Sequence, residues 1–162
     1  MIKIHSIIAF LLLSTSHILS ANDIIEHKVK VVVELPNPNF IVRPPTGNNW
    51  LYETQTMHWD MVGNRHSAIR QQLYIESSLG PVTARLYNEA ELVGINDRIP
   101  LNVRINSVLL TTTAQQILNS QDSHAGRLVP VHISIQPAPS GTQYQPGTYL
   151  GQVNLVFDIL SP

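Results

Sequence analysis

The chain has no cysteine and few charged side chains. Without cysteine there can be no disulfide, so an exported domain of this sequence has to be stabilised by packing and strand pairing. Charged residues make up 13% of the chain, about half the usual share, whereas Asn, Gln, Ser and Thr are common. Lysine and arginine form no basic patch, which argues against nucleic acid as a partner. This composition suits a sheet-rich surface that meets other surfaces.

Long hydrophobic runs are missing beyond the first 21 residues. Lys3 precedes an apolar run at 7–13 that is too short to span a bilayer, and small residues follow it. This order is typical of a secretory signal peptide, so we expect residues 1–21 to be removed, with cleavage after Ser20 or after Ala21. About 141 of the 162 residues then remain, the size of one domain. They carry nine basic and eleven acidic residues, a net charge near −2, and we expect an exported protein.

No motif of a known enzyme class is present. There is no Gly-x-Ser-x-Gly nucleophile turn, no glycine-rich phosphate loop and no His-Glu-x-x-His zinc motif. Glu89 and Glu91 lie two residues apart in a polar segment, which is more typical of a solvated loop than of a catalytic carboxylate pair. The sequence therefore predicts a protein that is not an enzyme and needs no cofactor.

The seven histidines do not form a ligand pattern. His58 and His66 are eight residues apart, as are His124 and His132. Neither spacing is typical of a metal site, and neither a cysteine nor a close carboxylate completes one. We therefore predict that the protein has no metal site.

The clearest pattern after the signal is an alternation of period two over residues 23–36. Apolar side chains stand at every second position, and Glu26, Lys28 and Lys30 stand between them. The alternation predicts a β-strand with one apolar and one polar face, and Pro36 ends it. Two interpretations are open at this point. The strand is either the ordinary first strand of a β-sandwich or a strand ahead of the folded body that is inserted into a neighbouring molecule.

Short alternating segments separated by turn signals follow along the rest of the chain. Asn106 and Ser107 predict a tight turn, and Thr112 with Gln115 fits the capping box of a short helix within 112–118. Many short strands with almost no helix favour an all-β, immunoglobulin-like antiparallel β-sandwich. We expect loops at 88–98, 119–127 and 137–147, and strands at 40–43, 50–61, 67–76, 82–87, 101–105, 108–111, 129–136 and 148–160.

Three stretches carry a resemblance to a known family. They are the alternating strand at 25–36 directly after the signal, the strand–turn–strand segment at 99–114, and the closing segment at 147–157 with its Gly, Tyr, Gly, Val, Leu pattern. In their order and spacing they resemble the shaft pilins of class 5, or alpha-type, fimbriae, which are the colonisation factor antigen family of the alternate chaperone–usher pathway. Segments 50–65 and 119–127 depart from the familiar members, so surface properties are not carried over.

The resemblance implies an incomplete β-sandwich that is missing its last strand. Residues 1–21 would be the signal peptide, 22–36 an N-terminal donor strand and 37–162 the pilin β-sandwich domain. In an isolated subunit the donor strand should have no complete partner in its own body, and in a fibre it should fill the groove of the next subunit. On this basis the donor side chains are Ile25, Val29, Val31, Val33 and Leu35, and the acceptor groove is lined by Phe40, Val42, Val153, Leu155, Phe157 and Ile159.

The resemblance also implies a function. It describes a structural (major) subunit of an adhesive fimbria that travels through the periplasm to the cell surface and polymerises by donor-strand exchange. The implied partners are identical or related pilin subunits, a periplasmic chaperone, an outer-membrane usher, a tip adhesin and a host-cell receptor. Two alternatives are a minor or tip fimbrial subunit and an exported carbohydrate-binding β-sandwich. In the latter, Trp50, Tyr52 and Trp59 would form the sugar platform, although such aromatics more often pack in cores or across strands.

Overall fold

The protein is built almost entirely of β-strands. A computed structural model describes residues 28–32, 39–60 and 65–160 of the chain. Among these residues, no helix is long and apolar enough to cross a membrane. The strands are β1 (Lys28–Val32), β2 (Phe40–Arg43), β3 (Trp59–Asp60), β4 (Arg65–His66), β5 (Ile69–Ser77), β6 (Val82–Leu86), β7 (Glu91–Val93), β8 (Arg98–Ile105), β9 (Val108–Leu109), β10 (Gln115–Leu118), β11 (Arg127–Ile135) and β12 (Leu150–Ile159), and the helices are the 3₁₀ turn η1 (Trp50–Tyr52) and α1 (Ser120–Ala125).

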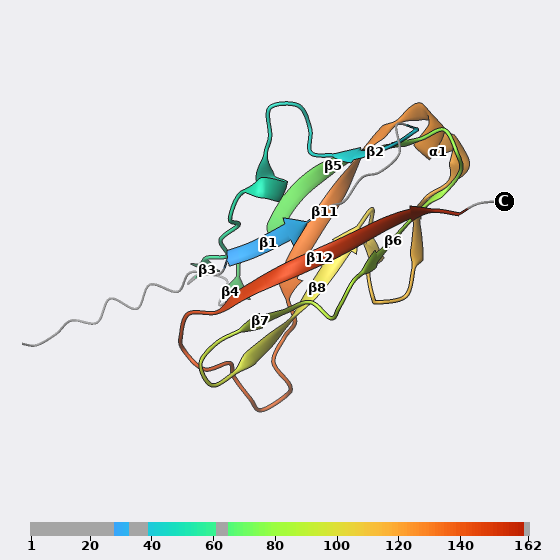
Figure 1. Ribbon diagram of the computed structural model, residues 1–162. Helices are drawn as coiled ribbons and strands as arrows, with labels where there is room; N and C mark the ends of the chain where they lie inside the picture. Colours follow the sequence, from blue (N-terminus) through green and yellow to red (C-terminus); the bar gives the residue numbers. More distant parts are fainter. Residues whose placement is uncertain (1–27, 33–38, 61–64, 161–162) are drawn as a thin grey trace, which may run out of the picture.

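The strands form two layers that are joined along one side. One layer runs in the order β2-β5-β11-β8, and the other runs β10-β6-β12-β1. β7 pairs with the start of β12 and the start of β8, so it connects the layers on that side. β1 and β2 are the outermost strands on the opposite, open side (Figure 1). The fold is thus an all-β, immunoglobulin-like sandwich. Among the described strands every ladder is antiparallel except the one between β1 and β12.

The core lies between the layers and follows the alternation of the long strands. Leu73 of β5 stands opposite Val129 of β11, and Ile69 stands opposite Ile133, within one layer, whereas Leu155 of β12 lies in the other. All of these side chains are buried in one hydrophobic cluster. The strands expected at 67–76, 82–87, 101–105, 129–136 and 148–160 are therefore confirmed, with small differences at their ends.

The strand expected at 50–61 is present only at Trp59–Asp60, as β3, and residue 61 lies outside the described residues. The segment opens with η1, in which Trp50 and Leu51 are buried while Tyr52 is exposed. The backbone N–H of Trp50 donates to Asn48 Oδ1 at 3.0 Å, and its indole Nε1–H donates to the carbonyl oxygen of Gln72 on β5 at 2.9 Å. The two hydrogen bonds fix this tight turn, and the turn places the large indole in the core without adding a strand to the sheet.

Of three smaller expectations, two need correction and one is confirmed. The helix expected within 112–118 is wrong, because Gln115–Leu118 is strand β10 and pairs with β6 across a bulge. The loop expected at 88–98 contains the short strand β7. The tight turn at Asn106 and Ser107 is confirmed. Both residues have positive φ, 48° and 69°, and Ile105 pairs with Val108, as in a two-residue hairpin of type I′.

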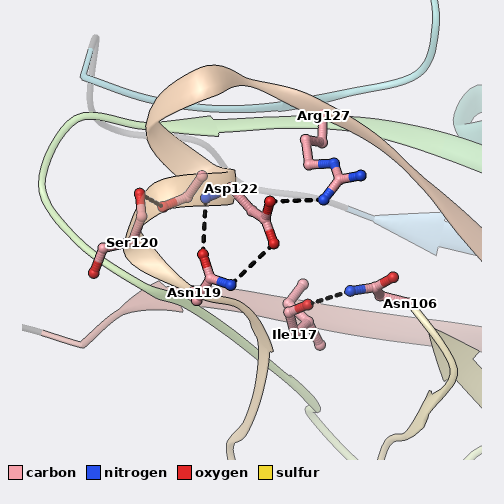
Figure 2. Close-up of polar contacts among 7 residues, drawn as sticks. Asn106, Ile117, Asn119, Ser120, Asp122 and Arg127 are labelled. Atoms are coloured by element: carbon pink, nitrogen blue, oxygen red, sulfur yellow. Dashed lines mark hydrogen bonds and ion pairs between the residues drawn. The ribbon is translucent and has the colours of Figure 1, made fainter.

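The polar loop expected at 119–127 contains the short helix α1, whose ends are held by side chains (Figure 2). Asn119 is its N-cap, because its Oδ1 accepts from the backbone N–H of Asp122 at 2.8 Å. The carboxylate of Asp122 accepts from Asn119 Nδ2 and from Arg127 on β11, at 3.0 and 2.6 Å. Ser123 is buried and donates to the carbonyl oxygen of Gly80 at 2.8 Å. The helix is thus fixed against the turn between β5 and β6, at one end of the sandwich.

Candidate functional site

The site of interest is the edge of β12 that faces the open side of the sandwich. β7 pairs with Leu150 and Gly151, and β6 pairs with Leu155–Ile159, so both lie along one edge of β12. β1 pairs with the same Leu150 and Gly151, so it has to lie along the other edge. Over Leu155–Ile159 this second edge has no partner among the strands that the structure describes. A sheet edge of this kind presents backbone N–H and C=O groups that can pair with an added strand.

β1 occupies the first half of this edge within its own chain. It runs parallel to β12 (Figure 1). Lys28 stands opposite Leu150, Val31 opposite Val153 and Val32 opposite Asn154. The expectation that the leading strand has no complete partner in its own body is therefore wrong for this structure. The reason is physical. An unpaired sheet edge accepts a strand that reaches it, and residues 28–32 of the same chain reach this one.

The inward face of β12 changes from closed to partly open along the strand. Val153 is 0% exposed and Leu155 is 4% exposed. Phe157 and Ile159, farther along, are only half-buried, although they pack against the core cluster. The alternation predicted for this strand is confirmed, because the intervening Gln152 and Asp158 are exposed. The apolar inward face of β12 thus continues beyond the end of β1, along the part of the edge that no described strand pairs with.

The other residues expected at the site lie in different places. Phe40 and Val42 are buried on β2, which is the outermost strand of the other layer on the same open side. Val29 is in β1, opposite Gly151. Ile25, Val33 and Leu35 lie outside the described residues. The topology therefore brings the two proposed walls of the groove, β2 and β12, to the same side of the sandwich.

The sequence did not reveal the support that β7 gives to the start of β12. A side chain at Gly151 would meet the carbonyl oxygen of Glu91, and its Cβ would lie 2.9 Å from Leu92 Cδ2 and 3.1 Å from Leu92 Cα. Leu92 is fully buried. β7 is only three residues long and has a single buried position, so no periodicity marked it. Glycine is needed here because the backbones of β7 and β12 approach closely.

Replacing Gly151 with alanine should therefore destabilise the fold by about 1–3 kcal/mol, because the new methyl group meets backbone that cannot move aside cheaply. Urea unfolding of the purified chain measures the loss. Gly147→Ala is the matched control, because a Cβ there would meet only Tyr149 Cε2, at 3.9 Å. Equal midpoints for the two variants would contradict the close approach of β7 and β12.

The electrostatics of the site offer little to a charged ligand. Tyr149, just before β12, is buried and donates from its hydroxyl to the carbonyl oxygen of Gln145 at 2.6 Å. Burial, with a smaller contribution from the negative charge of Asp97, raises the pKa of Tyr149, so its phenol stays neutral. Within the described ranges, no three His, Cys, Asp or Glu residues lie close enough together to hold a metal ion. The site is suited to strand pairing and apolar packing.

Comparison with known proteins identifies the family of the chain. A search of curated proteins found no significant match. Among solved structures, the chain is similar to the CooA pilin subunit from enterotoxigenic Escherichia coli, with 13% sequence identity and a TM-score of 0.48, over 77% of this chain and 100% of that one. The sequence profile of the CS1 type fimbrial major subunit family matches residues 25–158, which is most of the 162-residue chain. The chain is therefore a member of the CS1 type fimbrial major subunit family.

Proposed function

We propose that this chain is a structural subunit of the shaft of an adhesive, class 5 fimbria and that its subunits join by donor-strand exchange. Membership of a fimbrial subunit family makes other pilin subunits its partners and the surface fimbrium its location. The proposal adds how two subunits are joined. The leading strand leaves β12 of its own chain and pairs with β12 of the next subunit.

The observation that carries this proposal is the pairing of β1 with the open edge of β12. It supports exchange because an edge that accepts five residues of the chain's own leading strand has the spacing and the apolar floor to accept the same strand from a neighbour. The alternating residues Val29 and Val31 stand opposite Gly151 and Val153 in this register. The same alternation would direct them toward the groove of a neighbouring subunit.

The direction of the strand explains why exchange would be favourable. Only residues 33–39 separate Val32 from Phe40, the first residue of β2. Because β2 begins at the far end of the sandwich, beside Ser77, the chain's own strand can reach it only by running parallel to β12. A neighbour's strand has no such restriction and can run antiparallel, which gives a somewhat more stable ladder per residue.

The energy of burial is also sufficient for a persistent joint. Five large aliphatic side chains at about 1.5–3 kcal/mol each contribute on the order of 10 kcal/mol before ordering costs. A vacant edge above an apolar floor would otherwise be an aggregation hazard. We therefore propose that a periplasmic chaperone covers the groove and that an outer-membrane usher exchanges chaperone for neighbour, as in the alternate chaperone–usher pathway.

The proposal predicts how the exported protein behaves in detergent. Protein sheared from cells that carry the whole fimbrial gene set should run as a ladder of oligomers in mild detergent without heating, and boiling should collapse the ladder to the monomer. Strand-paired joints resist mild detergent because each one combines backbone hydrogen bonds with buried aliphatic side chains. A single monomer band before heating would contradict the proposal and would favour an exported carbohydrate-binding module.

A further inference from the structure

The two ends of the sandwich differ in shape and chemistry. One end holds the start of β12 and the turn between β7 and β8. The other end holds the turn between β5 and β6, the helix α1 and the end of β12, because Val82 pairs with Ile159 and Ser123 bonds to Gly80. The ten residues of β12 separate them (Figure 1), a distance of roughly 30 Å for an extended strand. A contact between these two ends is therefore a contact between two molecules.

The first end displays an apolar projection. Ile95 is 98% exposed, and it lies beside the cross-strand pair of Val93 and Leu150, both of which are also exposed. The turn that carries Ile95 is firmly held. The backbone N–H of Gly94 donates to the carbonyl oxygen of Asp97 at 2.9 Å, and the ring of Tyr149 lies 2.7 Å from where a Cβ at Gly94 would stand. A fully exposed isoleucine on a fixed turn, next to two other apolar side chains, is typical of a contact surface.

The second end carries a hollow. It has a volume of about 520 Å³ and lies between the turn that follows β5 and the outer side of α1. Leu79, which is half exposed, and Gly80 line it on one side, and His124 and Ala125 line it on the other. Its lining carries little charge, and it is large enough to admit a side chain the size of isoleucine. The backbone N–H of Ser78 donates to the carbonyl oxygen of Asn39, so the chain enters β2 directly beside this hollow.

The polarity of strand exchange brings these two ends together, and this step rests on the proposed function. A donor strand that runs antiparallel to β12 of the acceptor has its last residues near Leu150 of that acceptor. Those last residues lead into Asn39 of the donor, beside the hollow. We propose that Ile95 of each subunit inserts into the hollow beside Leu79 of the subunit whose strand it has received. The contact is head-to-tail, so it repeats along the fibre without closing.

Disulfide trapping tests this contact sharply, because the chain has no cysteine of its own. Fibres would be assembled from the full chain carrying Ile95→Cys with Leu79→Cys, oxidised mildly, boiled in detergent and separated without reducing agent. Boiling removes every non-covalent joint, so the expected result is a covalent ladder that reducing agent collapses to monomer. A second variant, Ile95→Cys with Ala125→Cys, samples another wall of the hollow. Ile95→Cys with Tyr87→Cys is the control, because Tyr87 is exposed beside Asn154 near the middle of β12 and should give no ladder.

The outcomes separate this contact from the joint itself. Normal fibres in which neither Leu79→Cys nor Ala125→Cys cross-links with Ile95→Cys would overturn the contact and leave strand exchange intact. Covalent dimers from Ile95→Cys alone would also overturn it, because they require like ends to meet. If the Tyr87→Cys control gave a ladder equal to that of the test pairs, cross-links would form equally well at the middle of β12 and at the hollow. This result would also contradict the contact. If the unaltered chain forms no fibres, the proposed function fails and the contact fails with it.

Discussion

Replacing Val31 with arginine is expected to abolish surface fibres. Val31 stands opposite Val153, a fully buried residue of β12, in the register that β1 adopts. In the proposed joint an arginine at this position would enter an apolar groove without a counter-ion, at a cost of several kcal/mol. The subunit should still fold with the proposed chaperone, because the long strands β5, β8, β11 and β12 keep their own core. The variant should fail only to supply a leading strand that pairs with the next subunit.

The matched control is Lys30→Ala, one residue away. By the alternation of the strand, position 30 belongs to the opposite face from Val31, so its loss should leave fibre number nearly unchanged. Both variants would be expressed together with the chaperone and the usher, and fibres would be counted by electron microscopy. Normal fibres from Val31→Arg would show that this strand is not the joint, and the proposed function would lose its main physical support.

Trp50→Ala should cause the largest loss of stability. The indole is 1% exposed, and its Nε1–H bonds to the carbonyl oxygen of Gln72. Truncation leaves a large cavity and removes the partner of that carbonyl, at an expected cost of about 3–5 kcal/mol. Because single domains are stable by only about 5–15 kcal/mol, much of the variant should be unfolded at moderate urea concentrations. Urea titration followed by circular dichroism measures the shift.

Tyr52→Ala provides the comparison within the same turn. Tyr52 is 79% exposed, so its removal should change the free energy of unfolding by no more than about 0.5 kcal/mol. If Trp50→Ala behaved like Tyr52→Ala, the indole would not be a core residue. The same pair of variants also tests the sugar-platform alternative, because that alternative needs an accessible aromatic at position 50.

The long strands could be predicted because each has one buried face. In β11, Val129, Val131 and Ile133 are buried while Pro130 is exposed, and this repeat of two is visible in the residues alone. Shorter elements carry too few positions for a repeat. β7 has one buried residue, and β10 buries Ile117 and Leu118 in succession because a bulge shifts its pairing with β6. At Thr112 and Gln115 a local helix signal was overridden by pairing along the edge of β6.

The partner of the leading strand could not be predicted for a different reason. Alternation specifies which face of a strand is apolar, but it does not specify the molecule against which that face packs. Val31 opposite Val153 satisfies the same pattern whether the two residues belong to one chain or to two. The apolar face of β12 was therefore accessible from the sequence, whereas the parallel pairing within the chain became evident only from the register in the structure.

The parallel pairing of β1 with its own β12 has a consequence for the rate at which fibres grow. Only seven residues join β1 to β2, and a strand tethered by such a short linker is present beside its own β12 at an effective concentration on the order of a millimolar. At equal intrinsic affinity, a competing strand from another subunit at micromolar concentration then occupies the edge about a thousandfold less often. Growth by the proposed exchange would accordingly be limited by how often a subunit gives up its own strand, and it would be insensitive to how often subunits collide. Under the proposed exchange, subunits would therefore accumulate without polymerising, and a fibre would lengthen only where the pairing of β1 with its own β12 is first released.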